Sequence, residues 1–415
     1  MSRVLSLLSS LERDAKLLIS ARALRSFIGG LISVIFTIYL SKLGVQPLTM
    51  GLLFTVTTSI AAARSLVEGV LADRFGRKPF LFLLNGIIAV SGVIYASTRN
   101  LAVLLPTSAL GGLGSMYLSS PSEQAMLSEK TIDRERTTLF SIASFISTIS
   151  SMFGAFSAGI PDFFQTRLGF EEIHSYQPIF ILAALIGLAC IGLTIPLREE
   201  RRRPLEKRDD EEEVVEEEVE YEETGKILSR FAVVVAFDAL GGSFIGRFLS
   251  YWFYIKFGVG PGKIGTLFGA SRLLSSLSYI LGLKMARRIG TVNATVLSRL
   301  PVVGVNLILP LIPTYTVAAL LQGFKSAFSM IDVPLRQSYL MGITRRSRRA
   351  SVAGASSTAM RVAATVAPTL SGYFFQYVSI MLPFFLGGTF QLTSAVLLWV
   401  LFKDIKPPEE RRKRN

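Results

Sequence analysis

The sequence contains very few of the side chains that build metal and redox centres. Its 415 residues include one cysteine, Cys190, and one histidine, His174. A lone cysteine cannot form an intramolecular disulfide, and this pair offers too few ligands for a zinc, haem or iron–sulfur site. We therefore expect neither a metal site nor a cofactor.

Charged residues are also scarce, at 18% of the chain, whereas soluble domains carry about 25%. Hydrophobic residues make up 50%, and the mean hydropathy is positive. A helix needs roughly 20 apolar residues to cross the hydrocarbon core of a bilayer. The sequence therefore predicts an all-α integral membrane protein with twelve spans, at residues 17–40, 49–71, 80–97, 101–122, 137–160, 178–197, 228–255, 264–286, 292–312, 317–340, 350–376 and 381–402.

The second half of the chain repeats the first at an offset of 213 or 214 residues. The matched positions include Gly44 and Gly258, Pro47 and Pro261, Gly51 and Gly265, Pro121 and Pro334, and Gln124 and Gln337. A duplicated set of membrane helices is typical of carriers, whose two halves enclose a site near the middle of the membrane. We expect six-helix bundles at residues 1–197 and 227–406, a charged cytoplasmic linker at 198–226 and a basic cytoplasmic tail at 407–415.

The net charge of +14 could indicate nucleic-acid binding, but its distribution argues against such a partner. If both termini are cytoplasmic, most basic loop residues lie on the inner side, as the positive-inside rule requires. The inner residues are Arg74, Arg77, Lys78, Arg134, Arg136, Arg287, Arg288, Arg345, Arg346, Arg348 and Arg349, with the basic tail 411–414. We therefore predict a multi-pass protein of the cell membrane, with both termini in the cytoplasm.

Ionisable residues inside the spans are the candidates for function. Each costs roughly 2.5–3.5 kcal/mol at the bilayer centre and should face protein or a water-filled cavity. Spans 80–97, 178–197 and 381–402 lack such residues and should face lipid, while span 292–312 contains only Arg299, which we assign to a structural ion pair. The candidates for substrate or coupling-ion binding are Arg25, Glu123, Asp238, Arg247, Arg272, Lys325, Asp332, Arg336 and Arg361.

Residues 69–79 read Gly-Val-Leu-Ala-Asp-Arg-Phe-Gly-Arg-Lys-Pro. This loop resembles the signature of the major facilitator superfamily, G-x-L-A-D-R-x-G-R-K, and the duplicated layout extends the resemblance over nearly the whole chain. It implies two bundles related by a pseudo-twofold axis, which transport a small solute by alternating access. Spans 1, 4, 7 and 10 would line the cavity. We expect a monomer embedded in the bilayer.

The resemblance also implies a gating motif formed by Gly69, Asp73, Arg74, Gly76, Arg77 and Lys78. In the family, the aspartate is held to bridge toward the start of the eleventh span, here near residues 350–351. The alternative is that the loop only orients the chain through its positive charge. The second-half counterpart, at residues 283–290, has Arg287 where Asp73 stands, so the motif is asymmetric.

The substrate class remains open between two interpretations. Arg247, Arg272, Lys325 and Arg361 outnumber the acids of the second half, which favours an organic anion such as an organic acid or a phosphorylated metabolite. Efflux of hydrophobic drugs is the alternative, although the glycine- and proline-rich motif of antiporters is poorly matched at residues 150–160. A receptor or membrane enzyme is a distant third, because no nucleophile–base pair is evident. We expect no enzymatic activity.

Protons are the expected coupling ion, with Asp238 as the best candidate carrier, because burial raises the pKa of a carboxylate toward the working range. A permanent ion pair with an arginine is the competing interpretation. The repeat also matches residues of opposite charge, Arg25 with Asp238 and Glu123 with Arg336, each at an offset of 213. These residues could pair across the two halves and close a gate, or each could pair within its own half.

Overall fold

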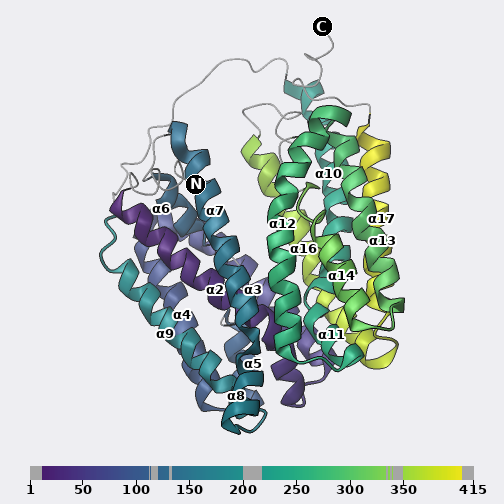
Figure 1. The fold of residues 1–415 in the computed structure, drawn as a ribbon. Helices are drawn as coiled ribbons and strands as arrows, with labels where there is room; N and C mark the ends of the chain where they lie inside the picture. Colours follow the sequence, from purple (N-terminus) through teal and green to yellow (C-terminus); the bar gives the residue numbers. More distant parts are fainter. Residues whose placement is uncertain are drawn as a thin grey trace. The chain divides into compact units, whose positions relative to one another are not determined.

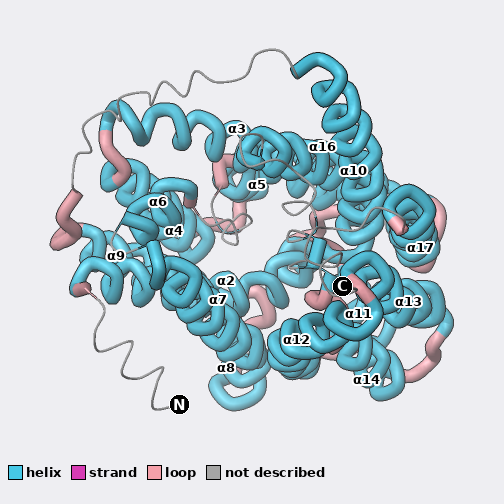
Figure 2. Tube along the Cα trace, turned by 90° about the horizontal axis from the view of Figure 1, so that it is seen from above, coloured by secondary structure: helices cyan, strands magenta, loops and turns pink. Residues whose placement is uncertain are grey.

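The computed structural model describes residues 12–111, 113, 120–129, 133–199, 217–332, 335–336, 339 and 349–403 (Figure 1). In these ranges the chain consists of helices and short loops, without a strand, as Figure 2 shows. The all-α fold expected from the sequence is therefore confirmed.

The helices follow the predicted spans closely. In the first half they are α2 (Arg13–Lys42), α3 (Pro47–Phe75), α4 (Lys78–Ser97), α5 (Leu101–Ala109), α6 (Pro121–Glu129), α7 (Asp133–Phe156), η2 (Ser157–Gly159), α8 (Ile160–Leu168), η3 (His174–Tyr176) and α9 (Gln177–Thr194). In the second half they are α10 (Glu217–Gly246), α11 (Leu249–Phe257), α12 (Pro261–Ile289), α13 (Thr291–Ile308), η4 (Leu309–Leu311), α14 (Tyr315–Ser326), α16 (Arg349–Tyr377) and α17 (Leu382–Phe402).

Some predicted spans are divided between two helices. Span 101–122 contains α5 and the start of α6, and span 228–255 contains parts of α10 and α11. Seven helical segments within the described ranges are long and apolar enough to cross a membrane. The predicted linker ends inside α10, whose first residue is Glu217.

Contacts along the chain divide it into two compact units. Unit 1 comprises Met1–Arg201 and Leu249–Leu273, and unit 2 comprises Arg202–Phe248 and Leu274–Asn415. The segment 249–273, which contains α11 and the start of α12, thus groups with the first-half helices. The bundle boundaries expected from the sequence, at residues 197 and 227, stay a prediction.

Glycines allow the helices of each unit to pack closely. In unit 1, α2 packs on α7 and α9, and α4 packs on α9. A Cβ atom added at Gly154 of α7 would lie 1.8 Å from the backbone oxygen of Phe27 in α2. In unit 2, α10 packs on α16 and α17, and a Cβ atom at Gly241 would lie 2.6 Å from the oxygen of Gly387. Small residues at such contacts are typical of membrane helix packing.

Helices α4, α9 and α17 each expose large apolar side chains. The exposed residues are Leu83, Val90 and Val93 in α4, Ile181, Leu185 and Leu188 in α9, and Leu392, Val396, Trp399 and Val400 in α17. Their spacing of three, four or seven residues places them on one face of each helix. Contact with lipid chains requires such a face, so the arrangement supports the prediction that these three spans face lipid.

Candidate functional site

A buried cluster of charges lies between α2 and α6 in unit 1. Glu123 of α6 accepts a hydrogen bond from Arg22 Nε, at 2.5 Å, and another from Arg25 Nη2. The Glu123 side chain is 2% exposed, and those of Arg22 and Arg25 are 13% and 9% exposed. Two cations therefore share one anion in a setting with little water.

Helix α3 fixes the start of α6 and so positions Glu123. The buried carboxylate of Glu68 accepts the backbone N–H of Ser122, at 3.2 Å, and the hydroxyl of Ser120. A carboxylate at the N-terminus of a helix satisfies free N–H groups and interacts favourably with the helix dipole. Glu123 follows directly in this first turn.

Neutral side chains extend the cluster to α4 and α9. Arg25 Nη1 donates to Asn85 Oδ1 of α4 at 3.1 Å, and Asn85 Nδ2 donates to Thr194 Oγ1 of α9 at 3.2 Å. The Cys190 thiol, also in α9, donates to the backbone oxygen of Ala21 at 3.5 Å. One hydrogen-bond network thus connects α2, α4, α6 and α9.

Unit 2 contains a second cluster, formed by two arginines and two aspartates. Asp238 Oδ2 of α10 accepts Arg299 Nη2 of α13 at 2.7 Å and Arg336 Nη1 at 2.9 Å. Asp332 Oδ2 accepts a hydrogen bond from Arg299 Nη2 at 2.6 Å and forms an ion pair with Arg336 Nη2 at 3.3 Å. The formal charges of this cluster cancel. Asp238 is its most accessible member, with 18% of its side chain exposed against 7–10% for the others.

The two clusters occupy equivalent positions with the charges reversed. Arg25 pairs with Glu123 in unit 1, while Asp238 and Arg336, 213 residues further on, pair with each other in unit 2. Of the two alternatives left open by the sequence, the structure thus shows pairing within each half. Asp238 pairs with two arginines of its own half, and its role as the proton carrier stays a prediction.

The correspondence extends to further positions of the repeat, some of which carry no charge. Asn85, the partner of Arg25, lies 214 residues before Arg299, the partner of Asp238. Ser394 of α17 donates to the backbone oxygen of Val234 at 2.8 Å, as Cys190 of α9 does to the equivalent backbone position. The repeat offset, applied to the third span of each half, matches Asn85 with Arg299 and so points to both as equivalent partners, of Arg25 and Asp238 respectively.

Arg299 forms the ion pair assigned to it, but its partners are the two acids selected as functional candidates. It contacts both Asp238 and Asp332, and its Nη1 donates to Ser394 Oγ at 3.0 Å. Arg299 therefore belongs with the candidate site residues, although its span is expected to be peripheral.

Lys325 of α14 lies apart from these ion pairs. Its Nζ donates to Asn306 Oδ1 of α13 at 3.0 Å, and Asn306 Nδ2 donates to Gln391 Oε1 of α17 at 2.7 Å. Lys325 is 8% exposed and forms no ion pair with any residue that the structure describes. The buried Oε1 of Gln322, one turn earlier, has no hydrogen-bond partner in the same part of the chain.

The remaining cationic candidates are dispersed. Arg272 of α12 belongs to unit 1, where it donates to the backbone oxygen of Ser151 at 2.7 Å and to Ser33 Oγ at 2.9 Å. Arg247 is half-buried after the end of α10, and Arg361 is exposed on α16. The structure does not bring these three into the cluster around Asp238.

The signature loop is tied to the segment that follows α9. Gly76 has φ +88°, and the N–H of Arg77 donates to the carboxylate of Glu199. Lys78 Nζ donates to the backbone oxygens of Ile195 and Leu197, at 2.6 and 3.0 Å.

Other parts of the predicted gating motif are described less fully. Arg74 is exposed, whereas the surroundings of Gly69 and the side chain of Asp73 lie outside what the structure describes. The expected bridge to residues 350–351 therefore stays a prediction. Gly290, with φ +83°, repeats the turn in the second half.

Comparison with known proteins places this arrangement in context. The family model described as "Major Facilitator Superfamily" matches residues 18–331 and 231–415. An uncharacterized membrane protein of Saccharomyces cerevisiae, YJR124C, is 24% identical over 431 residues, which cover 95% of each chain. Multidrug resistance protein 1 of Bacillus subtilis is 27% identical over 183 residues, covering 43% of this chain and 44% of the relative.

Solved structures share the fold. The nucleoside transporter NupG superposes with a TM-score of 0.70 at 13% identity, covering 94% of this chain and 100% of that structure. A D-xylose–proton symporter superposes with a TM-score of 0.68 at 14% identity, covering 95% and 97%. At such identities the likeness concerns the fold alone.

Proposed function

Since the chain belongs to the major facilitator superfamily and is a multi-pass membrane transporter, we propose that it carries a small organic anion, with proton coupling, by alternating access. Proteins of this fold include a D-xylose–proton symporter and a human organic anion transporter, the latter with a TM-score of 0.57 and 15% identity. The positive-inside bias supports an orientation with both termini in the cytoplasm, and we place the carrier in the cell membrane.

Lys325 is the observation that carries the choice of an anion. An ammonium group can donate three hydrogen bonds, and the described contacts account for one, to the neutral oxygen of Asn306. A buried charge without a counterion is costly inside a membrane and marks a functional position. An anionic substrate would provide the missing counterion when it binds.

The other buried cations of unit 2 are already neutralised. Arg299 and Arg336 share Asp238 and Asp332, so an arriving anion would have to displace a carboxylate to reach them. Lys325 requires no such displacement. Among the described second-half cations, Lys325 is therefore the best candidate for direct contact with an anionic group.

Proton coupling is supported by the arrangement around Asp238. Its carboxylate bridges Arg299 and Arg336, and its side chain is the most accessible of the four. Protonation would weaken both ion pairs at once and leave the cluster with one excess positive charge. A proton at Asp238 would thus loosen the connection between α10, α13 and the tenth span, which is the kind of change that alternating access requires.

Transport assays in proteoliposomes can test the anion. Uptake of radiolabelled carboxylates would be measured under a pH gradient of either direction for the wild type, Lys325→Gln and Lys403→Gln. Lys403 is exposed at the end of α17, so its substitution gives the same charge change without the buried site. We expect at least a tenfold loss of uptake in Lys325→Gln and no loss in Lys403→Gln. Transport by Lys325→Gln at the wild-type rate would contradict the role of Lys325.

The coupling ion needs a separate measurement. Asp238→Asn should abolish uphill transport driven by a pH gradient but retain counterflow exchange of the same solute, because exchange does not need net proton movement. If uphill transport survives in this variant, Asp238 is not the proton carrier.

Efflux of hydrophobic compounds is a second candidate, favoured by the names of two Bacillus subtilis relatives. The methylenomycin A resistance protein and multidrug resistance protein 1 are 25% and 27% identical over 37% and 43% of this chain. Under this alternative, the same liposomes would extrude a hydrophobic dye, and Lys325→Gln would leave that activity unchanged.

A further inference from the structure

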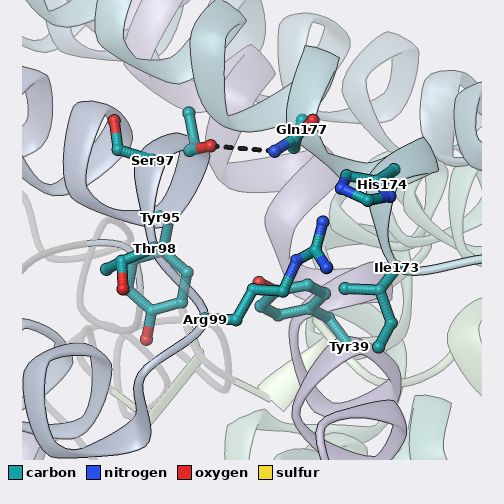
Figure 3. Close-up of a pocket in the computed structure, with 9 residues that line it drawn as sticks. Tyr39, Tyr95, Ser97, Thr98, Arg99, Ile173, His174 and Gln177 are labelled. Atoms are coloured by element: carbon teal, nitrogen blue, oxygen red, sulfur yellow. Dashed lines mark hydrogen bonds between the residues drawn. The ribbon is translucent and has the colours of Figure 1, made fainter.

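We propose that a pocket in unit 1, at the ends of α2 and α4 and the start of α9, binds a small carboxylate through Arg99 and Tyr39 (Figure 3). Its volume is about 390 Å³, within the roughly 300–1,000 Å³ range of small-molecule sites. The lining residues include Tyr95 and Thr98 of the α4 end and His174 and Gln177 near the start of α9.

The pocket is distinct from the buried charge cluster of the same unit. Asn85, the α4 member of that cluster, precedes Tyr95 by ten residues. At 1.5 Å per residue, the two positions are about 15 Å apart along the helix. The pocket also lies at the opposite end of α4 from the signature loop, so neither known feature accounts for its polar lining.

Tyr39 provides a hydrogen-bonding group fixed at the base of the pocket. Its ring packs against those of Tyr176 and Phe180, with centroids 5.3 and 4.8 Å away, and the residue is 2% exposed. Buried tyrosine hydroxyls usually have a partner. The Tyr39 hydroxyl has none among the residues that the structure describes, whereas the neighbouring Tyr95 hydroxyl bonds Ser108 and the backbone oxygen of Leu104.

Arg99 is the unbalanced charge at this pocket. Its guanidinium makes no ion pair or hydrogen bond within the described ranges, and it lies close enough to act electrostatically on the Tyr39 hydroxyl. In Figure 3 the guanidinium points toward His174. The nearby acids are engaged, because Glu172 pairs with Lys42 and Glu171 contacts His174 Nδ1 at 3.0 Å.

The loop that carries Arg99 is held by its own hydrogen bonds. Asn100 N donates to Thr98 Oγ1 at 3.1 Å, and Asn100 Oδ1 caps α5 by accepting Ala102 N at 2.9 Å. Arg99 is therefore presented from an ordered turn, which reduces the entropy lost when it binds a ligand.

The hydrogen-bond donors of the pocket match a small, otherwise apolar molecule that carries one carboxylate. The planar guanidinium can form two parallel hydrogen bonds to a carboxylate, and the Tyr39 hydroxyl can donate a third. Gln177 Nε2 already donates to the oxygen of Ala96 at 3.1 Å, so that amide nitrogen is engaged. Aromatic rings and the side chain of Ile173 provide apolar walls. This binding does not depend on the proposed transport activity.

Fluorine NMR with 4-fluorobenzoate as the probe tests the proposal on the purified full chain in phospholipid-free micelles. We expect saturable binding, at least tenfold weaker for Arg99→Gln and several-fold weaker for Tyr39→Phe, which retains the packed ring. Arg167→Gln is the matched control, because Arg167 is exposed on α8 and does not line the pocket. The neutral isostere 4-fluorobenzamide should bind at least tenfold more weakly.

Equal weakening by Arg99→Gln and Arg167→Gln would overturn the proposal, since it would indicate general charge attraction. Unchanged affinity in Arg99→Gln would also overturn it. Loss of binding in Lys325→Gln but not in Arg99→Gln would place the probe at the transport site and leave the proposed transport intact. Complete displacement by phosphatidylglycerol would identify a lipid-headgroup site instead of a site for a soluble carboxylate.

Discussion

Replacing Glu123 with glutamine should destabilise unit 1 more than any surface charge change. The substitution keeps the shape of the side chain and removes the negative charge shared by Arg22 and Arg25. In the described part of the chain, Glu123 is the ion-pair partner of both arginines. Two buried cations would then face each other without a carboxylate between them.

The expected magnitude follows from two estimates. Unit charges about 4 Å apart attract by about 4 kcal/mol at an effective dielectric constant of about 20. Removal of one partner from a buried ion pair typically costs about 3–5 kcal/mol. We therefore expect Glu123→Gln to lower the free energy of unfolding by about 3–5 kcal/mol, and the coupling energy between Arg25 and Glu123 to reach about 2–3 kcal/mol.

A double-mutant cycle measures this coupling. Equilibrium unfolding in mixed micelles would compare the wild type with Arg25→Gln, Glu123→Gln and the double variant. Lys42 and Glu172 form the control pair, because Glu172 is 58% exposed and such pairs contribute about 0–1 kcal/mol.

Two results would refute the reasoning. One is a coupling between Arg25 and Glu123 no larger than that of the control pair. The other is a larger coupling between Arg25 and Asp238, which would show that the main partner of Arg25 lies in the other half.

Two glycine substitutions make further predictions, both measured by thermal unfolding. Gly76→Ala should be more destabilising than Gly169→Ala. Gly76 (φ +88°, ψ 165°) occupies a backbone region almost restricted to glycine, where another residue costs about 1–3 kcal/mol. A new Cβ atom at Gly76 would also lie 2.7 Å from the Glu199 carboxylate. Equal effects would mean that the turn relaxes. Gly154→Ala should lower the melting temperature, since its Cβ atom would lie 1.8 Å from a backbone oxygen of α2. Gly192 has open space around it, so Gly192→Ala should be neutral or should stabilise the fold by up to about 1 kcal/mol. A tolerated Gly154→Ala would disprove the close contact between α2 and α7.

The sequence predicted the helices well because membrane insertion depends on local composition. The span expected at 80–97 corresponds to α4 (Lys78–Ser97), and the span expected at 381–402 corresponds to α17 (Leu382–Phe402). A run of about 20 apolar residues has few alternatives to a helix in a bilayer, since every backbone polar group must be satisfied internally. The signature loop then identified the family.

Partner choice was harder to predict because it depends on which side chains meet in space. Asn85 carries no charge and was overlooked, although it binds Arg25. Arg99 carries no signal of its own in the sequence, because nothing local shows that the Tyr39 hydroxyl lies near it. The repeat held part of the missing information, since its offset matches Asn85 with Arg299.

The reversed polarity of the two clusters makes the halves mechanically similar but electrostatically different. In each half an ion pair connects the first membrane span to the fourth. The attraction between the two side chains depends on the product of their charges, so either polarity stabilises the bundle. The net charges differ, however, because Arg22 and Arg25 share one acid in unit 1, while unit 2 balances two arginines with two aspartates. A proton taken up by unit 2 would give its cluster the same single excess charge that unit 1 carries permanently. Under the proposed proton coupling, uptake at Asp238 would therefore weaken the ion pairs of unit 2 and leave the ion pairs of Glu123 in unit 1 in place.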